Sequence, residues 1–244
     1  MSSAYDVYNA FTRISSLNPM IFLDYDGTLV DIVINPWEAV ADQELIKLLS
    51  DLSRRYETFI ATGRSLDDIE AMVPMEINII ALHGSVTKIT GKPPTFVPGY
   101  SRYVALCHQL AERYADIGKM YPGLRIFDKG GGLLFHTGLM DRKFEKDLRA
   151  KLQEIASDVG MELYAGYNIF ELRIPRVSKG TAIRKLRIGN RYAMIAGDEG
   201  TDEQAFDLNI DAIKVKVREG NTIADFILRD VHEMRSALKL IAYS

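Results

Sequence analysis

Two acidic residues, Asp24 and Asp26, directly follow a short apolar run at Met20–Leu23. A run of this length that leads into a turn is typical of a buried strand. Two carboxylates only two positions apart repel each other unless a cation lies between them or a reaction requires both. The spacing therefore indicates a reaction site or a metal site at the end of this strand.

Polar residues follow two further apolar runs in the same way. The residues after Thr58–Ala61 are Thr62, Gly63 and Arg64, and those after Tyr192–Ala196 include Asp198, Glu199 and Asp202. Parallel strands bind ligands beyond their carboxyl ends, so we expect these side chains to meet at one edge of a sheet. Carboxylate oxygens at the density of Asp24, Asp26 and Asp198 favour Mg²⁺, which offsets their repulsion and binds phosphate oxygens.

Lys179 is the cation that we expect to face a phosphate. It stands at the start of a predicted helix with Ser178 as its N-cap, so its ammonium group and the helix dipole can face one anion together. Thr62 adds a hydroxyl donor. Gly27 and Gly63 have no Cβ, so their peptide N–H groups can approach phosphate oxygens closely.

Short apolar runs alternate with amphipathic stretches at both ends of the chain, a pattern typical of βαβ units around a parallel sheet. We expect strands at Met20–Leu23, Thr58–Ala61, Asn78–Leu82, Tyr192–Ala196 and Asp211–Val217. We expect helices at Asp42–Arg55, Ser65–Met72, Ser178–Leu186, Thr201–Asp207 and Thr222–Ala242. The predicted fold class is α/β, with a Rossmann-like parallel-sheet core at 1–84 and 176–244. Residues 85–175 have a different pattern and are predicted to form an inserted, smaller α+β cap domain.

The composition argues against several other classes of protein. With 244 residues, 47% of them hydrophobic, the chain can bury one large core or two smaller ones. A formal net charge of −3 gives no general attraction to nucleic acid or to anionic membranes, so we expect neither as a partner. The single cysteine, Cys107, rules out an internal disulfide framework, and we find no signal-peptide core or membrane-spanning run. These features predict a cytoplasmic location.

Taken in order, the segments DYDGTL, ATGR, SKG and GDEGTDE resemble the four motifs of the haloacid dehalogenase-like phosphatases. The resemblance implies that Asp24 attacks phosphorus and becomes an aspartyl-phosphate. It also implies that Asp26 protonates the leaving alcohol and then activates water. One acid would thus form the new bond and the other would move the proton.

The same resemblance assigns the metal and phosphate ligands. It implies that Asp24, the backbone carbonyl of Asp26 and Asp198 hold Mg²⁺. Glu199 and Asp202 would support these ligands. Thr62 and Lys179 would neutralise the phosphoryl oxygens.

Further segments are similar to those of the trehalose-6-phosphate phosphatases. They are NPWEA at 35–39, LHG at 82–84, FDKGGGLLFH at 127–136 and FELRIPRVSKGTAI at 170–183. This resemblance implies hydrolysis of trehalose 6-phosphate under a mobile cap, with a trehalose-phosphate synthase as a candidate partner. It assigns Glu171, Arg173, Lys129 and His136 to the face of the cap that closes over the sugar.

The chain departs from this family pattern at three places. Leu82 stands where the family usually has an acid, and Glu199 replaces a more usual Asp. Thr137–Gly138 follow His136 where a Tyr-Arg pair is common. The first and third departures bear on the sugar contacts, and none changes the residues expected to transfer the phosphoryl group.

Other functions remain open from the sequence. One is a phosphatase for another small sugar phosphate, of the sucrose-phosphate, mannosylglycerate-phosphate or phosphoglycolate type. Another is a non-catalytic domain that senses sugar phosphate, although the presence of both Asp24 and Asp26 argues against it. Arg64 is predicted to bind substrate, with a surface ion pair as the alternative. The segment Ala4–Ile14 is a predicted helix that packs either on the core or on a partner.

Overall fold

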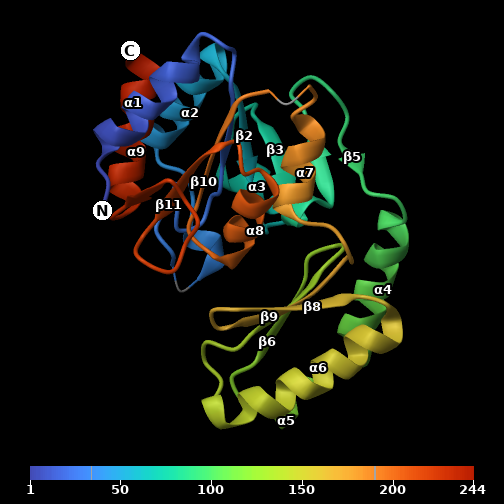
Figure 1. The fold of residues 1–244 in the computed structure, drawn as a ribbon. Coiled ribbons are helices and arrows are strands. Elements are labelled where there is room, and N and C mark those ends of the chain that lie inside the picture. Colours follow the sequence, from blue (N-terminus) through green and yellow to red (C-terminus); the bar gives the residue numbers. More distant parts are fainter. Residues whose placement is uncertain (34, 190) are drawn as a thin grey trace. The chain divides into compact units, whose positions relative to one another are not determined.

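The computed structural model describes residues 1–33, 35–189 and 191–244, which divide into two compact units (Figure 1). The first unit comprises Met1–Thr95 and Ser178–Ser244, and the second comprises Phe96–Val177. Both boundaries lie later than the expected positions after residues 84 and 175. The first boundary differs because strand β4 (Val86–Lys88) pairs antiparallel with β3 (Asn78–Ala81) and so extends the sheet of the first unit.

The first unit is built on an eight-stranded sheet, counted over the described residues, in the order β12-β11-β10-β1-β2-β3-β4-β5. Its other strands are β1 (Met20–Leu23), β2 (Glu57–Ala61), β5 (Thr95–Phe96), β10 (Ala193–Gly197), β11 (Ile213–Val217) and β12 (Phe226–Leu228). The strands from β12 to β3 are parallel to one another. Every residue of β1 is buried, as expected for a central parallel strand with helices over both faces of its sheet.

Helices cover both faces of this sheet. They are α1 (Ala4–Ser15), α2 (Gln43–Arg55), α3 (Leu66–Met72), α7 (Lys179–Leu186), α8 (Gly200–Leu208) and α9 (Val231–Tyr243), with 3₁₀ turns at Pro36–Glu38 and Leu82–Gly84. Figure 1 shows α1, α2 and α9 gathered on one side of the sheet and α7 with α8 on the other. Under α7 and α8, the rings of Phe22 and Phe59 stack with their centroids 5.1 Å apart. Among the described residues, no helix combines the length and the apolar character needed to cross a membrane.

The expected helix Thr222–Ala242 is wrong in its first half. Residues 226–228 form the edge strand β12, parallel to β11, and helix α9 begins only at Val231. The side chain of Asp230 caps α9 by accepting a hydrogen bond from the peptide N–H of Glu233 at 2.8 Å. A short apolar run such as Phe226–Leu228 cannot be assigned to strand or helix by its periodicity alone.

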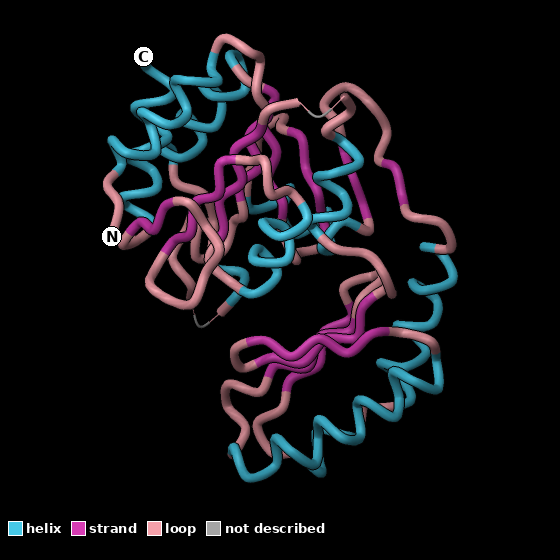
Figure 2. The backbone as a smooth tube through the Cα atoms, viewed as in Figure 1, coloured by secondary structure: helices cyan, strands magenta, loops and turns pink. Residues whose placement is uncertain are grey.

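The second unit contains a four-stranded antiparallel sheet with helices along one face (Figure 2). Its elements are α4 (Tyr100–Arg113), α5 (Ile117–Met120), β6 (Arg125–Asp128), β7 (Leu133–His136), a 3₁₀ turn (Arg142–Phe144), α6 (Glu145–Val159), β8 (Glu162–Gly166) and β9 (Ile169–Arg173). The strand order is β6-β7-β9-β8. Leu133 and Phe135 of β7, with Phe170 and Leu172 of β9, pack on the helices. Because side chains alternate along a strand, the intervening residues lie on the opposite face.

Helix α1 packs on the core of the first unit, which answers a question that the sequence left open. Its side chains Val7 and Phe11 are buried. The ring of Phe11 meets that of Tyr56 edge to face, with the centroids 5.0 Å apart. Val7 and Phe11 therefore contribute to the stability of the first unit.

Replacing Phe11 with Ala should destabilise the protein by about 3 kcal/mol, because it removes a buried ring and leaves a cavity. Equilibrium urea unfolding measures the change in the free energy of unfolding. Tyr5→Ala is the matched control, since Tyr5 lies on the same helix with 63% of its surface exposed and should change little. Equal stability of the two variants would show that α1 does not contribute to the core.

Candidate active site

Three loops of the first unit begin at the carboxyl edge of its parallel sheet. Strand β1 pairs with β10 on one side and with β2 on the other. Because these strands end close to the same level, the residues that follow them, Asp24, Thr62 and Asp198, emerge at one edge. The peptide N–H of Asp24 donates a hydrogen bond to the carbonyl of Ala196 at 2.9 Å, which fixes the first loop beside the third.

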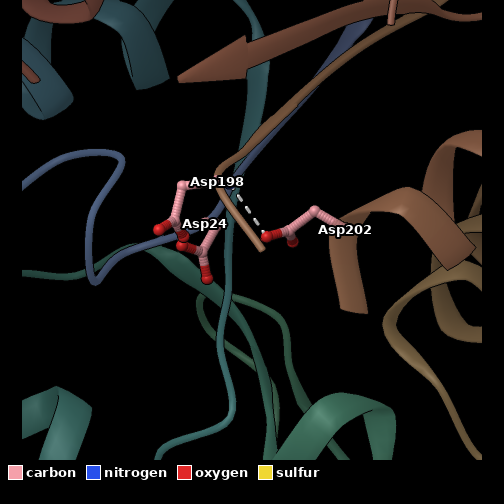
Figure 3. A group of neighbouring side chains, drawn as sticks. All are labelled: Asp24, Asp198 and Asp202. Atoms are coloured by element: carbon pink, nitrogen blue, oxygen red, sulfur yellow. Dashed lines mark hydrogen bonds between the residues drawn. The ribbon is translucent and has the colours of Figure 1, made fainter. Parts of the chain in front are cut away.

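Asp24, Asp198 and Asp202 form a compact acidic cluster. One carboxylate oxygen of each lies within 4.8 Å of the others. Figure 3 shows the carboxylates of Asp24 and Asp198 side by side, with Asp202 approaching from α8. The Oδ2 atom of Asp202 accepts hydrogen bonds from the peptide N–H groups of Asp198 and Glu199, both at 3.1 Å. Asp202 thus holds the loop that carries Asp198.

Lys179 lies between two of these acids. Its Nζ atom is 2.6 Å from Oδ1 of Asp24 and 2.9 Å from Oδ1 of Asp202. Only 2% of its side chain is exposed. Ser178 caps helix α7 by accepting a hydrogen bond from the peptide N–H of Thr181, so Lys179 is the first residue of the helix, as predicted.

Burial of these charges shifts their pKa values. Burial raises the pKa of Asp24 well above its ordinary value; Lys179 opposes this shift, while Asp202 and Asp198 add to it. Burial alone would lower the pKa of Lys179, but Asp202 and Asp24 outweigh it and the pKa is raised. Burial and Asp202 raise the pKa of Asp198 to about 6, although Arg218 opposes the shift. Burial therefore makes the charged forms of Asp24 and Asp198 costly, and a cation bound beside them would offset part of this cost.

The donor set fits a divalent metal ion such as Mg²⁺, which prefers hard carboxylate oxygens. Of the five residues assigned to the metal from the sequence, the structure brings together the side chains of three, Asp24, Asp198 and Asp202. The carboxylate of Glu199 instead accepts a hydrogen bond from the hydroxyl of Thr201 at 2.7 Å, at the start of α8. The carboxylate of the fifth residue, Asp26, contacts an arginine.

Arg64 binds the carboxylate of Asp26 through two hydrogen bonds. Its Nε atom is 2.7 Å from Oδ2 and its Nη2 atom is 2.6 Å from Oδ1. The side chain of Asp26 is 36% exposed, whereas Asp24 is buried. The two acids of the DxD motif therefore lie in different environments, as acids with different chemical roles do. Arg64, predicted to bind substrate, contacts the predicted proton carrier.

The turn at residues 82–84 supports the loop that carries Thr62. The peptide N–H of His83 donates to the carbonyl of Thr62 at 3.0 Å. Leu82 and His83 both have positive φ, 46° and 54°, a conformation that non-glycine residues rarely adopt and that clusters at functional sites. The His83 ring lies against Gly63, where a Cβ would collide with it. Gly63 is thus required by the packing of this turn.

Three of the residues predicted to face the sugar form one cluster in the second unit. The carboxylate of Glu171, with 1% of its side chain exposed, accepts from Nζ of Lys129 at 2.7 Å and from Nε of Arg173 at 2.8 Å. The guanidinium of Arg173 lies 3.7 Å from the centre of the Tyr164 ring. By strand alternation Tyr164, Glu171 and Arg173 lie on the face of the sheet opposite its helices, and Lys129 follows strand β6.

His136 lies on the same face, in register with Ile169 of β9. Its Nδ1 atom is 3.3 Å from Nη2 of Arg125. Burial, reinforced by Arg125, lowers the pKa of His136 and favours the neutral ring. A neutral imidazole can both donate and accept a hydrogen bond.

Two cations at the acidic cluster were not predicted from the sequence. Arg218, which follows β11, forms an ion pair with the carboxylate of Asp198. Lys216 of β11 donates from Nζ to the backbone carbonyl of Asp198 at 2.5 Å. The segment KVKVR at 214–218 could have indicated both residues, since alternating cations are unusual in a strand of a buried parallel sheet.

The fold of this chain is that of the haloacid dehalogenase-like hydrolases. A solved haloacid dehalogenase-like hydrolase from B. subtilis superposes with a TM-score of 0.62 over 90% of this chain and 98% of that one. The sequence identity is 16%, so this comparison shows a shared fold.

The profile of the trehalose-phosphatase family matches residues 22–230. A trehalose-6-phosphate phosphatase-related protein from Thermoplasma acidophilum is 46% identical over 222 residues, which cover 91% of this chain and 96% of that protein. A crystal structure of a trehalose-6-phosphate phosphatase related protein superposes with a TM-score of 0.86 at 46% identity and the same coverage of both chains. The chain therefore belongs to the trehalose-phosphatase family and is a phosphoric monoester hydrolase.

Similarity also extends to a larger relative. A bifunctional trehalose-6-phosphate synthase/phosphatase from Thermoproteus tenax is 28% identical over 235 residues. The match covers 90% of this chain but only 31% of that protein, so this chain corresponds to about a third of it.

In metal-free protein, Asp198 should contribute a loss of stability as the pH rises from about 4 to about 6, and Asp198→Asn should remove this contribution. Folded Asp198 has a pKa of about 6, whereas in the unfolded chain it loses its proton near pH 4. Across this interval the folded state binds more protons, so its stability declines with pH. Melting temperatures in EDTA at a series of pH values measure the effect. Identical slopes for wild type and Asp198→Asn would contradict it.

Proposed function

We propose that this protein is a Mg²⁺-dependent phosphatase that releases trehalose from trehalose 6-phosphate through an aspartyl-phosphate intermediate on Asp24. The observation that carries the proposal is the buried carboxylate of Asp24, paired with Lys179 and adjacent to Asp198, in a chain of the trehalose-phosphatase family. The bifunctional relative from Thermoproteus tenax supports the view that a synthase partner supplies the substrate.

Asp24 is positioned to act as the nucleophile. One of its oxygens accepts from Nζ of Lys179 at 2.6 Å, and the other accepts from the hydroxyl of Thr28 at 3.1 Å. Because both oxygens have a hydrogen-bond donor, the carboxylate of Asp24 is held in one orientation. In the first step an oxygen of Asp24 forms a bond to phosphorus while the bond from phosphorus to the sugar oxygen breaks.

Asp26 moves the proton in both steps. It gives a proton to the leaving sugar oxygen, and in the second step it takes one from the water that attacks the aspartyl-phosphate. That attack breaks the bond between phosphorus and the Asp24 oxygen and releases phosphate. Since Arg64 binds the Asp26 carboxylate, Asp26 must leave this contact to reach the leaving group, and its partial exposure permits the movement.

The other motif residues stabilise charge. Asp24, Asp198 and the backbone carbonyl of Asp26 would hold Mg²⁺, with Asp202 and Glu199 in support. When bound there, Mg²⁺ supplies positive charge that offsets the carboxylates and polarises the phosphoryl oxygens. Lys179 and the hydroxyl of Thr62 would face the same oxygens, and the absence of a Cβ at Gly27 and Gly63 would let peptide N–H groups approach them.

Asp24→Asn should abolish the release of phosphate from trehalose 6-phosphate, because an amide cannot form the acyl-phosphate. Asp26→Asn should slow turnover by about 10²–10⁴-fold, the usual contribution of general acid–base catalysis. A phosphate-release assay measures both variants. Asp31→Asn is the matched control, since Asp31 is exposed and lies outside the DxD motif. Turnover by Asp24→Asn would refute the scheme.

Sugar selectivity is assigned to the cluster of Lys129, Glu171 and Arg173 in the second unit. Sugar hydroxyl groups both donate and accept hydrogen bonds, so an acid held between two cations offers them acceptors and donors at once. The two contacts to Glu171 also fix the direction of its carboxylate. We assign His136, on the same face of the sheet, a weaker polar contact.

Glu171→Gln should lower kcat/KM for trehalose 6-phosphate by about tenfold, the value of one hydrogen bond to a charged group. It should leave the hydrolysis of a generic aryl phosphate nearly unchanged, since that substrate has no disaccharide. Glu154→Gln on the exposed side of α6 is the control. A screen across sugar phosphates completes the test. If trehalose 6-phosphate is turned over no better than the aryl phosphate, the sugar assignment fails.

A further inference from the structure

Strand β11 and the residue after it place three cations on one face of the core sheet. Lys214, Lys216 and Arg218 alternate with valines, and alternate residues of a strand face the same way. Lys214 and Lys216 are buried, although lysines are seldom buried without a partner. This strand lies directly beside β10, which leads into Asp198.

Two of the three cations contact Asp198, each at a different group. Lys216 donates from Nζ to the backbone carbonyl of Asp198 at 2.5 Å and lies 3.6 Å from Oε1 of Glu203. Arg218 forms its ion pair with the carboxylate of Asp198. The third, Lys214, pairs with Asp225 at 3.3 Å instead. Strand β11 thus holds the main chain of Asp198 with one residue and its carboxylate with another.

The backbone of Arg218 is held in a conformation that only a few non-glycine residues adopt. Its φ is 70°, and its peptide N–H donates to the carbonyl of Leu228 in β12 at 2.8 Å. The guanidinium also lies against Gly27, with φ of 79°, where a Cβ would collide with both Arg218 and Asp198. Arg218 therefore lies between the loop that carries Asp198 and the turn at Gly27. Backbone strain of this kind is concentrated at functional sites.

We propose that Arg218 is a positioning residue that substitutes for the charge of the divalent cation on Asp198 and must leave this carboxylate for the ion to bind. The inference rests on the proposed function, because it presupposes a divalent cation at Asp24 and Asp198. A buried carboxylate without a partner is costly, so the guanidinium stabilises the metal-free cluster. The Arg218 side chain is 39% exposed and can move into water. Lys216 holds only the carbonyl and keeps the loop in place in both states.

Arg218→Gln tests this exchange, since it removes the charge and retains the Cβ with its backbone strain. The dissociation constant for Mn²⁺, measured from the electron paramagnetic resonance signal of the free ion, should fall about tenfold, the value of one hydrogen bond between charged groups. The dissociation constant of Arg218→Lys should lie between those of wild type and Arg218→Gln. In EDTA the Gln variant should melt at a lower temperature than wild type, and saturating Mg²⁺ should remove the difference. A purely structural role for Arg218 would leave that difference unchanged.

Two controls separate the possible failures. Arg229→Gln makes the same change in net charge at an exposed arginine that pairs with Asp230, so it measures general electrostatics. Asp198→Asn shows whether the measured ion binds at this site. If wild type binds no Mn²⁺, or if Asp198→Asn binds it equally well, the metal site of the proposed function fails and this inference with it. A different result overturns only this inference. It is that wild type binds Mn²⁺ at this site, but Arg218→Gln binds Mn²⁺ no more tightly than wild type or than Arg229→Gln.

Discussion

The structure depends on one buried group of charges, the ammonium of Lys179 between Asp24 and Asp202. Charges are costly to bury unless each has a well-placed partner, and all three side chains are almost wholly inaccessible to water. The contact joins the loop after β1 to the starts of α7 and α8, across 155 residues of sequence between Asp24 and Lys179. Correct folding of the first unit and assembly of its reaction site therefore rest on the same interaction.

The two acids of the DxD motif lie in opposite environments, although both follow the end of strand β1. Asp24 is buried directly after β1, whereas Asp26, which precedes the turn at Gly27 with its φ of 79°, is partly exposed and contacts Arg64. One carboxylate is consequently fixed by Lys179 and Thr28, and the other is partly exposed and paired with a single arginine. This difference in burial supports the proposed division of labour, in which Asp24 is the nucleophile and Asp26 carries the proton.

The two faces of the antiparallel sheet in the second unit have different characters. Its helices cover only one face of an antiparallel sheet, and strand alternation sends Glu171 and Arg173 to the other face together because they are two residues apart. A charged cluster can form there without disturbing the apolar core on the helical side. Under the proposed function, substitutions on that face would alter sugar selectivity without changing the loops that carry Asp24, Thr62 and Asp198.

Much of the fold was predictable from local pattern. The fold class and the family resemblance are confirmed, because short apolar runs and the order of the motifs after them are local properties of the sequence. The roles of the individual site residues stay predictions, although Asp24, Asp198 and Lys179 do meet at one edge of the sheet. The first boundary of the inserted unit and strand β12 were misjudged, since each depends on pairing with a neighbouring strand.

The sequence by itself determined which residues end the central strands, because burial and strand length act over a few positions. Only the tertiary structure decided their partners. Arg64 meets Asp26 across 38 residues, and Arg218 meets Asp198 across 20 residues and from a different strand. Such ion pairs depend on strand order and on how far each strand extends, and these are set by packing of the whole sheet.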